Sequence, residues 1–256
     1  GHWEGDLVEG SRGTYIATLV ERTSRFVILI KIPEKRTEAV VDALVRLVAE
    51  TVKGGPQESP LRTMHLKPGM TVSRDLMRDA AILARDKGVM LHTHLAENDE
   101  DIAYSEAMFG CRPGQYAEDL GWTGADVWHA HCVKLDEAEM VLFAQSHTGV
   151  AHCPCSNCRL GSGIAPVRRM RDLGVKVGLG VDGSASNDAG NLIAEARQAM
   201  LLQRVARGAD AMSAREALEI ATRGGADVLG RPDCGRIAVG KRADIALWDV
   251  SGVESA

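Results

Sequence analysis

From residue 88 onwards, apolar residues fall into short continuous runs that are separated by longer mixed stretches. Four such runs, with the polar residues that close them, occupy residues 88–97, 126–135, 149–157 and 175–184. Continuous apolar runs of this length are typical of parallel strands that are buried on both faces. The sequence therefore predicts four parallel strands in this part of the chain.

The stretches between and after these runs have the apolar spacing of amphipathic helices. They predict helices over residues 73–87, 136–146, 164–173, 187–207 and 213–229. Ser73 and Ser213 are expected N-caps, the second in a capping box with Glu216, and Gly88 is expected to end the first helix. Residues 235–250 predict a hairpin-like pair of short strands, so the regular helix and strand alternation stops before them.

The first 66 residues follow a different pattern. Apolar β-branched residues at 14–20 and 25–32 predict a hairpin or meander, and residues 37–52 predict an amphipathic helix. Strand, strand and helix in this order is α+β in character. We therefore expect two segments, an α+β segment over 1–66 and an α/β segment over 67–256.

Composition narrows the class of protein without identifying it. Of the 256 residues, 45% are hydrophobic and 25% are charged, which is ordinary for a globular protein. No apolar run reaches the roughly 20 residues of a membrane span, and the start of the chain lacks a secretory leader, so a cytoplasmic location is expected. The net charge of -5 argues against a nucleic-acid partner. The six cysteines are then expected to be reduced thiols.

Polar side chains that suit catalysis stand at the ends of the predicted strands. His94 and Glu97 close the first run, His131 closes the second, and Asp182 follows the fourth. The carboxyl ends of parallel strands meet at one edge of a sheet, so these side chains are expected to lie close together. Neutral imidazole and carboxylate groups bind zinc and transfer protons. The sequence therefore predicts a metal-assisted acid–base site.

Other polar residues have a simpler interpretation. A histidine within a strand, such as His92 or His129, is commonly a structural residue, and we expect His129 to support the site without taking part in it. Cys153, Cys155 and Cys158 form a C-x-C-x-x-C pattern, but no second cysteine pair accompanies it. We therefore favour a substrate-contacting loop over a separate zinc site at these cysteines.

Residues from about 70 to 250 resemble the C-terminal part of the metal-dependent amidohydrolases. The resemblance is to the branch that deaminates purines and acts on s-triazines, and within it to the 8-oxoguanine deaminase group. It implies strands 5–8 of a TIM-type (βα) barrel with C-terminal helices and a short β tail. The motifs that carry it occur in the family's order: HTHLAE, HAHCVKL, GVAHCPCSNCRLGSGIAPVRRM, GLGVDGSASND and GKRADIALWDV.

The resemblance implies roles for individual residues. His94 matches a metal ligand, and Glu97 matches the glutamate that protonates a ring nitrogen of the substrate. His131 matches a histidine that orients the attacking water and lies beside the metal. Asp182 matches an aspartate that binds the metal and accepts a proton from the water. Zn²⁺ is the expected ion, with Fe²⁺ as the alternative, and the reaction is hydrolytic deamination of an aminopurine-like or s-triazine-like ring.

The resemblance also implies substrate contacts and exposes a departure from the family. His152, Asn157, Arg159 and Ser184 match positions that contact a small heterocyclic substrate. The family carries an earlier His-x-His pair that supplies two metal ligands, and no such pair precedes His92. We therefore expect poor metal affinity and impaired activity. The unpaired edges of a partial barrel favour a homo-oligomer. That the pair at 92–94 is itself the first-strand pair remains an alternative.

The start of the chain carries a second resemblance. The motifs HWEGDL and TLVERTSRFVILI resemble the catalytic core of insertion-sequence transposases, which have an integrase-like, RNase H-type fold. That resemblance covers about residues 1–65 and implies that Asp6 is the first of three metal-binding carboxylates. The chain does not continue the family's pattern after residue 66. A remnant of a DNA-transposition enzyme and a non-catalytic chimera are therefore the alternatives to a deaminase.

Overall fold

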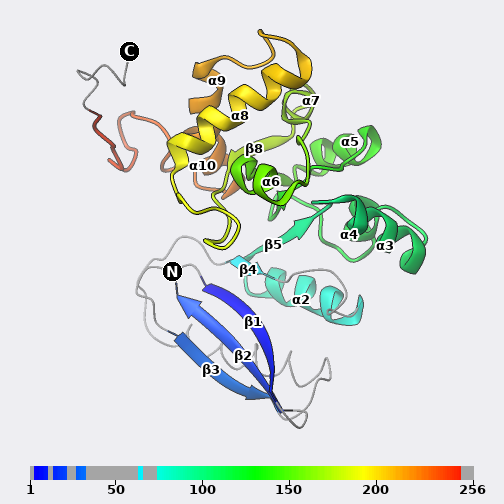
Figure 1. Cartoon of the computed structure of the whole chain (residues 1–256). Helices are drawn as coiled ribbons and strands as arrows, with labels where there is room; N and C mark the ends of the chain where they lie inside the picture. Colours follow the sequence, from blue (N-terminus) through cyan, green and yellow to red (C-terminus); the bar gives the residue numbers. More distant parts are fainter. Residues whose placement is uncertain (1–2, 11–13, 22–26, 33–62, 66–73, 249–256) are drawn as a thin grey trace.

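A parallel five-stranded sheet forms the centre of the computed structural model, which describes residues 3–10, 14–21, 27–32, 63–65 and 74–248 (Figure 1). The strands follow one another in sequence order across the sheet, and each pairs in parallel with the next. The four predicted strands are confirmed, and one short strand is added at the edge. The strands are β4 (Thr63–His65), β5 (Met90–Leu95), β6 (Val127–His131), β7 (Gly149–His152) and β8 (Lys176–Leu179).

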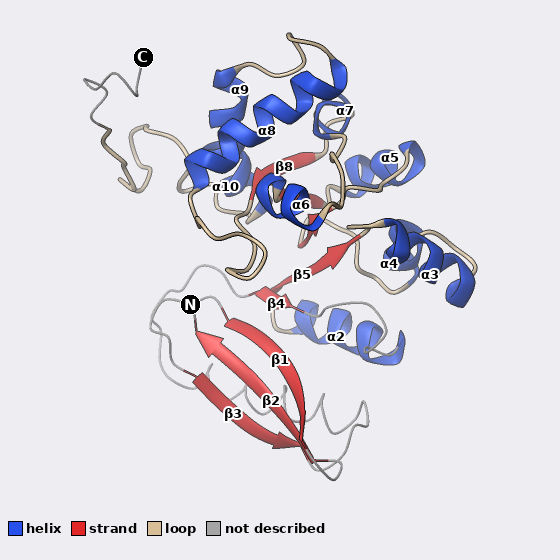
Figure 2. Ribbon diagram, in the orientation of Figure 1, coloured by secondary structure: helices blue, strands red, loops and turns tan. Residues whose placement is uncertain are grey.

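Helices connect successive strands of this sheet and cover it (Figure 2). Sequential parallel strands joined by helices are the arrangement of a barrel wall, so the expected TIM-barrel-like architecture is confirmed at this level. The helices are α2 (Arg74–Asp86), α3 (Asp99–Phe109), α4 (Pro113–Asp119), α5 (Glu137–Ser146), α6 (Pro154–Leu160), α7 (Val167–Asp172), α8 (Leu192–Arg207), α9 (Ala214–Glu219), the π-helix η1 (Ile220–Gly224) and α10 (Gly225–Val228).

The strand β5 has two different faces. Leu91, Thr93 and Leu95 are buried, whereas His92 and His94 alternate with them and are half-buried. Because successive side chains of a strand point to opposite sides, both histidines share one face, as the sequence predicts. Strand β7, on the far side of β6 from β5, is buried along its whole length. The sheet therefore places apolar side chains in the core and leaves one face of β5 for polar groups.

The buried core lies between the sheet and its helices. Trp122 and Phe143 are fully buried there, and the indole Nε1 of Trp122 donates a hydrogen bond of 2.8 Å to the carbonyl of Met77. This bond satisfies the polar atom of the largest core side chain and connects α2 to the segment before β6. Burial of these aromatic side chains stabilises the contact between helices and sheet by roughly 1.5–3 kcal/mol for each.

Hydrogen bonds at helix ends determine where several helices begin. Ser213 and Glu216 form the predicted capping box at α9, and Asp136 and Glu139 form another at α5. Gly88 has a φ of 60°, which confirms it as the left-handed residue that follows α2. The predicted N-cap Ser73 lies outside the described residues.

One predicted helix and one predicted loop near the strand ends are corrected. Helix α8 was expected from residue 187, but it begins at Leu192 because the Asn191 side chain accepts hydrogen bonds from the backbone N–H groups of Ile193 and Ala194. Residues 154–160 were expected to be loop, but they form α6 with Pro154 at its first position. A proline is well suited to that position because its missing N–H would have no partner there.

The end of the chain also differs from the prediction. Residues 213–229 form α9, η1 and α10 in succession rather than one regular helix. A hairpin was expected over 235–250, but the described residues 235–248 contain no strand. Apolar side chains in this tail, including Val239 and Leu247, are exposed, because no described strand pairs with them.

A separate antiparallel sheet contains the first described residues. Its strands are β1 (Trp3–Gly10), β2 (Thr14–Glu21) and β3 (Val27–Ile32), paired in the order β1-β2-β3. The predicted meander is confirmed, and β1, which contains Asp6, extends it. The predicted helix over 37–52 lies outside the described residues. No helix in the described part of the chain is long and apolar enough to cross a membrane.

Candidate active site at the carboxyl ends of the strands

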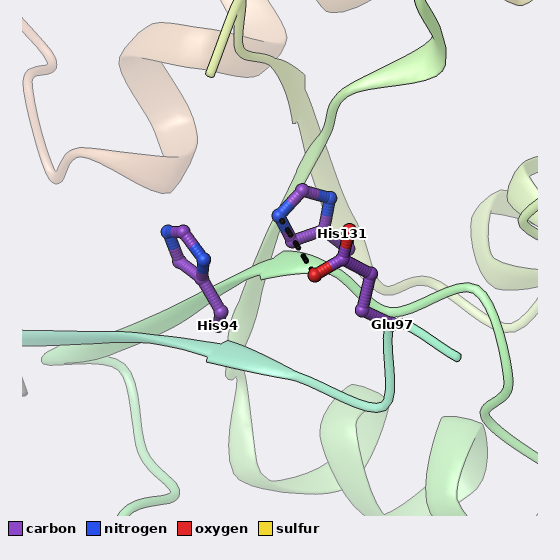
Figure 3. A group of neighbouring side chains, drawn as sticks. All are labelled: His94, Glu97 and His131. Carbon is purple, nitrogen blue, oxygen red and sulfur yellow. Dashed lines mark ion pairs between the residues drawn. The ribbon is translucent and has the colours of Figure 1, made fainter. Parts of the chain in front are cut away.

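Three side chains from two neighbouring strands converge at the carboxyl end of the sheet (Figure 3). His94 lies on β5, Glu97 follows β5, and His131 ends β6. One ligand atom from each of them lies within 4.8 Å of the others, which is the spacing of groups that can hold a metal ion. The ring centroids of His94 and His131 are 4.9 Å apart and meet edge to face. The structure thus brings together the residues predicted to form the site.

His131 is the central group of the cluster. Its ring is buried, and Nε2 lies 3.7 Å from Glu97 Oε2, marked by the dashed line in Figure 3, and 3.9 Å from Asp182 Oδ2. On the other side of the ring, Nδ1 lies 2.8 Å from Asn157 Oδ1. With the amide in this orientation, Nδ1 carries a proton and donates a hydrogen bond to Asn157 Oδ1. Nε2 then faces the two carboxylates.

The orphaned nitrogen of His131 provides a test of whether a metal ion fits here. Nε2 is buried and has no hydrogen-bond partner among the described residues. A buried polar atom without a hydrogen-bond partner lowers the stability of the fold, so a bound ligand is a physical explanation for its position. Neutral imidazole and carboxylate are suitable donors for zinc. The donor set of His94, Glu97, His131 and the nearby Asp182 therefore fits a divalent ion.

Asp182 follows β8 and is held as an anion by hydroxyl groups. Ser156 Oγ and Ser186 Oγ donate hydrogen bonds to its Oδ2 at 2.6 and 2.8 Å. Burial opposes ionisation, but these bonds, the Gly183 N–H and the nearby His131 outweigh it and hold the pKa of the carboxyl below its ordinary value. Asp182 is consequently a carboxylate at neutral pH, ready to bind a cation or accept a proton.

Backbone strain is concentrated at the same strand ends. Ala96, His131 and Asp182 have positive φ angles of 49°, 68° and 61°. Residues other than glycine rarely adopt this conformation, which costs of the order of 1–3 kcal/mol. Such residues cluster at functional sites because the surrounding structure must hold them in place. The strain here turns His131 and Asp182 away from the regular strand direction.

Two of the predicted substrate residues are buried and two are exposed. Asn157 is buried and contacts His131, whereas Arg159 and Ser184 are exposed, and Arg159 pairs with Asp188. His152 is fully buried at the end of β7, and burial, followed by the proximity of His131, lowers its pKa to about 3. The ring of His152 is therefore neutral, and neither of its nitrogens has a hydrogen-bond partner within the described residues.

The remaining histidines of β5 and β6 pack against aromatic side chains. His92 stacks on Trp128 with ring centroids 3.5 Å apart. His129 is buried beside Phe143, and its Nε2 lies 3.0 Å from the carbonyl of Trp122. His129 thus belongs to the core and does not touch the cluster of His94, Glu97 and His131.

The cysteines do not form a metal site in the described part of the chain. All six are free thiols, and the single group of three or more potential ligands found there is His94, Glu97 and His131. Cys153 is buried, and Cys158 is exposed. Burial raises the pKa of Cys155 to about 12, with the nearby Glu195 adding to the effect, so its thiol stays protonated at neutral pH.

Three residues that contact the site were missed in the sequence. Ser156 binds Asp182, and Ser162 Oγ lies 3.4 Å from Glu97 Oε1. Glu195 is a buried carboxylate on α8 that binds two segments beside Asp182. Ser156 stands in the recognised motif GVAHCPCSNCRLGSGIAPVRRM, but Glu195 stands in an ordinary amphipathic helix. Only the folded structure shows that Glu195 faces inward towards the site.

A parallel sheet joined by helices, with imidazole and carboxylate groups at its carboxyl edge, is the arrangement of barrel enzymes, whose active sites lie at that edge. Residues 10–255 match the amidohydrolase family. The chain belongs to this family.

Several individual proteins are similar to this chain. The chain is 46% identical to the 8-oxoguanine deaminase of Pseudomonas aeruginosa over 178 residues, which cover 70% of this chain and 40% of that protein. It is 42% identical over 231 residues to an isoxanthopterin deaminase from an unknown prokaryotic organism, covering 82% of this chain and 47% of the relative. The fold is similar to that of the atrazine chlorohydrolase TrzN from Arthrobacter aurescens TC1 in complex with zinc, with a TM-score of 0.78 and 36% identity. The match covers 86% of this chain and 49% of the TrzN chain.

The chain spans less than half the length of these three relatives, with coverage of 40%, 47% and 49% of their chains. None of the relatives named above is a transposase. The integrase-like resemblance of residues 1–65, with its RNase H-like fold, therefore stays a prediction, and the family match already begins at residue 10.

Proposed function

We propose that this chain carries the proton-transfer and metal-binding residues of a hydrolytic deaminase that acts on an aminopurine-like or s-triazine-like ring. The observation that carries the proposal is the buried, unpartnered Nε2 of His131, which faces Glu97 and Asp182 at 3.7 and 3.9 Å. The named relatives support the substrate class, because two are deaminases of fused nitrogen heterocycles and one acts on a triazine.

His94, His131 and Asp182 would hold the ion, with Zn²⁺ favoured by these donors and by the zinc in the related TrzN structure. A bound zinc ion lowers the pKa of a water molecule and polarises the ring carbon that is attacked. Fe²⁺ is the alternative, because it takes the same donors.

The two carboxylates would move protons on opposite sides of the reacting carbon. Asp182, held as an anion by Ser156 and Ser186, accepts a proton from the attacking water. Glu97 donates a proton to the ring nitrogen next to the same carbon. The C–O bond forms, and Glu97 takes the hydroxyl proton of the adduct in return for the one it gave. The exocyclic C–N bond breaks, and the leaving amine takes the proton held by Asp182 and departs as ammonia. General acid and base groups of this kind contribute typically 10²–10⁴-fold each.

His131 would orient the reacting groups through its tautomer. Its Nδ1 donates to Asn157 Oδ1, which leaves Nε2 as the nitrogen that faces the carboxylates and would bind the ion. Asn157, together with His152, Arg159 and Ser184, would also contribute to the substrate pocket. Arg159 and Ser184 are exposed, which suits the recognition of a small polar heterocycle arriving from solvent.

We also propose that the chain is organised into two segments, residues 1–66 and 67–256. A second copy of the chain is proposed to associate with the first through the edges of the sheet. The short strand β4, at residues 63–65, pairs with β5 and so joins the sheet next to that boundary. An edge strand with unpaired backbone groups favours pairing with a second copy.

The proposed function is tested by measuring metal content and ammonia release from 8-oxoguanine, isoxanthopterin and an amino-s-triazine. We expect Asp182→Asn to lower ammonia release at least 100-fold, because the proton acceptor is lost. Asp126→Asn is the matched control, since Asp126 precedes β6 at the opposite end of the sheet, pairs with Arg85, and should leave activity within about twofold. Zinc-loaded protein that releases no ammonia from any of these rings would contradict the proposal, as would full activity in Asp182→Asn.

A further inference from the structure

The buried carboxylate of Glu195 connects two segments that both reach the site. Glu195 lies on α8 and is 1% exposed. Its Oε2 accepts a hydrogen bond of 3.0 Å from the backbone N–H of Cys155, in the first turn of α6. Its Oε1 accepts another hydrogen bond from Nδ2 of Asn187, in the loop after β8. Both partners are hydrogen-bond donors, so the carboxylate of Glu195 accepts both hydrogen bonds and needs no proton of its own to do so.

Asn187 transmits this contact to the backbone beside Asp182. The same Nδ2 donates a hydrogen bond of 2.7 Å to the carbonyl of Val181. Val181 directly precedes Asp182, whose φ of 61° is a strained conformation for a residue other than glycine. Such a conformation persists only where neighbouring contacts hold it. Asn187 is buried, and the contacts that hold it come from Glu195 and from its own loop.

The side chain of Asp182 is bound by the same two segments. Ser156, which directly follows Cys155 on α6, donates to Oδ2, and Ser186, which directly precedes Asn187, donates to the same atom. Glu195 therefore binds the residue next to each of the two serines, and its partner Asn187 binds the backbone next to the aspartate.

We propose that Glu195 is a positioning residue that, through Cys155 and Asn187, holds the Asp182 carboxylate in the geometry needed to bind a divalent metal ion. This inference rests on the proposed function, because it assigns Asp182 to the metal. Partners that orient metal ligands typically contribute 10–100-fold to metal affinity. Both carboxylate oxygens of Glu195 are bound to Cys155 and Asn187, so its effect would reach the metal only through the position of Asp182.

The test compares two isosteric substitutions on the same helix. In Glu195→Gln, the new amide N–H faces either the Cys155 N–H or the Asn187 Nδ2, and one buried hydrogen bond is lost. Gln203→Glu is the matched control: Gln203 is fully buried on α8 and binds Ala165 and Arg168, neither of which contacts the site. Zn²⁺ affinity is measured by competition calorimetry, and stability by urea unfolding, in the full chain.

We expect both substitutions to lower the urea midpoint, and only Glu195→Gln to weaken Zn²⁺ binding by the folded protein, by about tenfold or more. Equal Zn²⁺ affinity in Glu195→Gln and wild type would overturn the inference, as would an equal loss in Gln203→Glu. Asn187→Ala is the second variant, and it should weaken Zn²⁺ binding even if Glu195→Gln fails to fold. Unchanged affinity in that variant would also count against the inference.

Asp182→Asn separates this inference from the proposed function. If Asp182→Asn leaves Zn²⁺ affinity unchanged, the metal assignment of Asp182 fails and the proposed function fails with it. If Asp182→Asn weakens binding but Glu195→Gln does not, the proposed function stands and the positioning role of Glu195 is wrong.

Discussion

At the scale of single residues, the same side chain serves different purposes according to its surroundings. His131 ends its strand with a positive φ and presents Nε2 to two carboxylates. His129, two residues earlier, is buried against Phe143 and binds the carbonyl of Trp122. The sequence motif HAHCVKL contains both, so the difference between the histidine proposed for the site and the structural one comes from what each ring contacts.

The buried ring of His129 makes stability depend on pH. Burial lowers its pKa to about 4, an effect partly offset by hydrogen bonding to backbone carbonyls, whereas the unfolded chain titrates near 6.5. As pH falls below 6.5, the unfolded state takes up the proton first, so stability is lost. Between pH 7 and pH 5 the contribution of His129 to this loss is about 2 kcal/mol.

We therefore expect His129→Gln, which keeps a donor for Trp122, to reduce the difference in unfolding free energy between pH 7 and pH 5 by about 2 kcal/mol. Urea unfolding at the two pH values measures it. His147→Asn is the control, because His147 is exposed and its ring stays hydrated in both states. A pH dependence in His129→Gln equal to that of wild type would show that the buried ring does not titrate as described.

At the scale of elements, a close backbone contact between η1 and β8 explains why a glycine is needed at a position that the side-chain pattern does not predict. The π-helix η1 ends at Gly224, and a Cβ added there would lie 2.2 Å from the carbonyl oxygen of Val177 on β8. A Cβ added at the next residue, Gly225, would meet no atom within 4 Å. The helix approaches the strand so closely that only one of two adjacent glycines is required.

Gly224→Ala should accordingly destabilise the protein by on the order of 2–4 kcal/mol, because a backbone atom of β8 must move. Gly225→Ala should be neutral or stabilising by up to about 1 kcal/mol, since both residues have helical φ and alanine favours the helix. The unfolding free energy in urea distinguishes the two. Equal effects of the two substitutions would mean that η1 does not pack against β8 in this way.

The helices that could not be predicted from the sequence share a physical cause. Residues 154–160 contain a proline and three polar residues and read as a loop, yet they form α6, whose first turn is anchored by Glu195 from α8. The start of α8 was predicted too early because residues 187–191 are instead held by side-chain bonds, including Asn187 to Val181. In both cases a side-chain hydrogen bond to the backbone outweighs local propensity, from a distant residue for α6 and from nearby residues for α8.

At the scale of the whole molecule, the site joins three parts of the sheet. His94 comes from β5, His131 from β6, and Asp182 from the loop after β8. An ion bound by all three would connect strands that are otherwise linked only through their neighbours. Metal binding is therefore expected to stabilise the folded sheet as well as to support catalysis.

Addition of Zn²⁺ should raise the melting temperature, and removal with EDTA should reverse the change. At a free zinc concentration 100 times Kd, the gain in unfolding free energy is about 2.7 kcal/mol. His94→Ala should remove most of this gain, because one ligand is lost. Thermal unfolding followed by circular dichroism measures it, and a zinc-dependent shift that persists in full in His94→Ala would place the ion elsewhere.

The sequence by itself determined the parallel strands and the identity of the residues at their ends. Both depend on local periodicity, and parallel strands with apolar faces necessarily bring their carboxyl ends to one edge. Only the tertiary structure decided that His131 binds Asn157, that His129 enters the core, and that Glu195 holds the loop of Asp182. Asn157 and His131 stand 26 residues apart, and Glu195 and Cys155 stand 40 apart. Such contacts are specified by how helices pack on the sheet, which no local pattern of residues records.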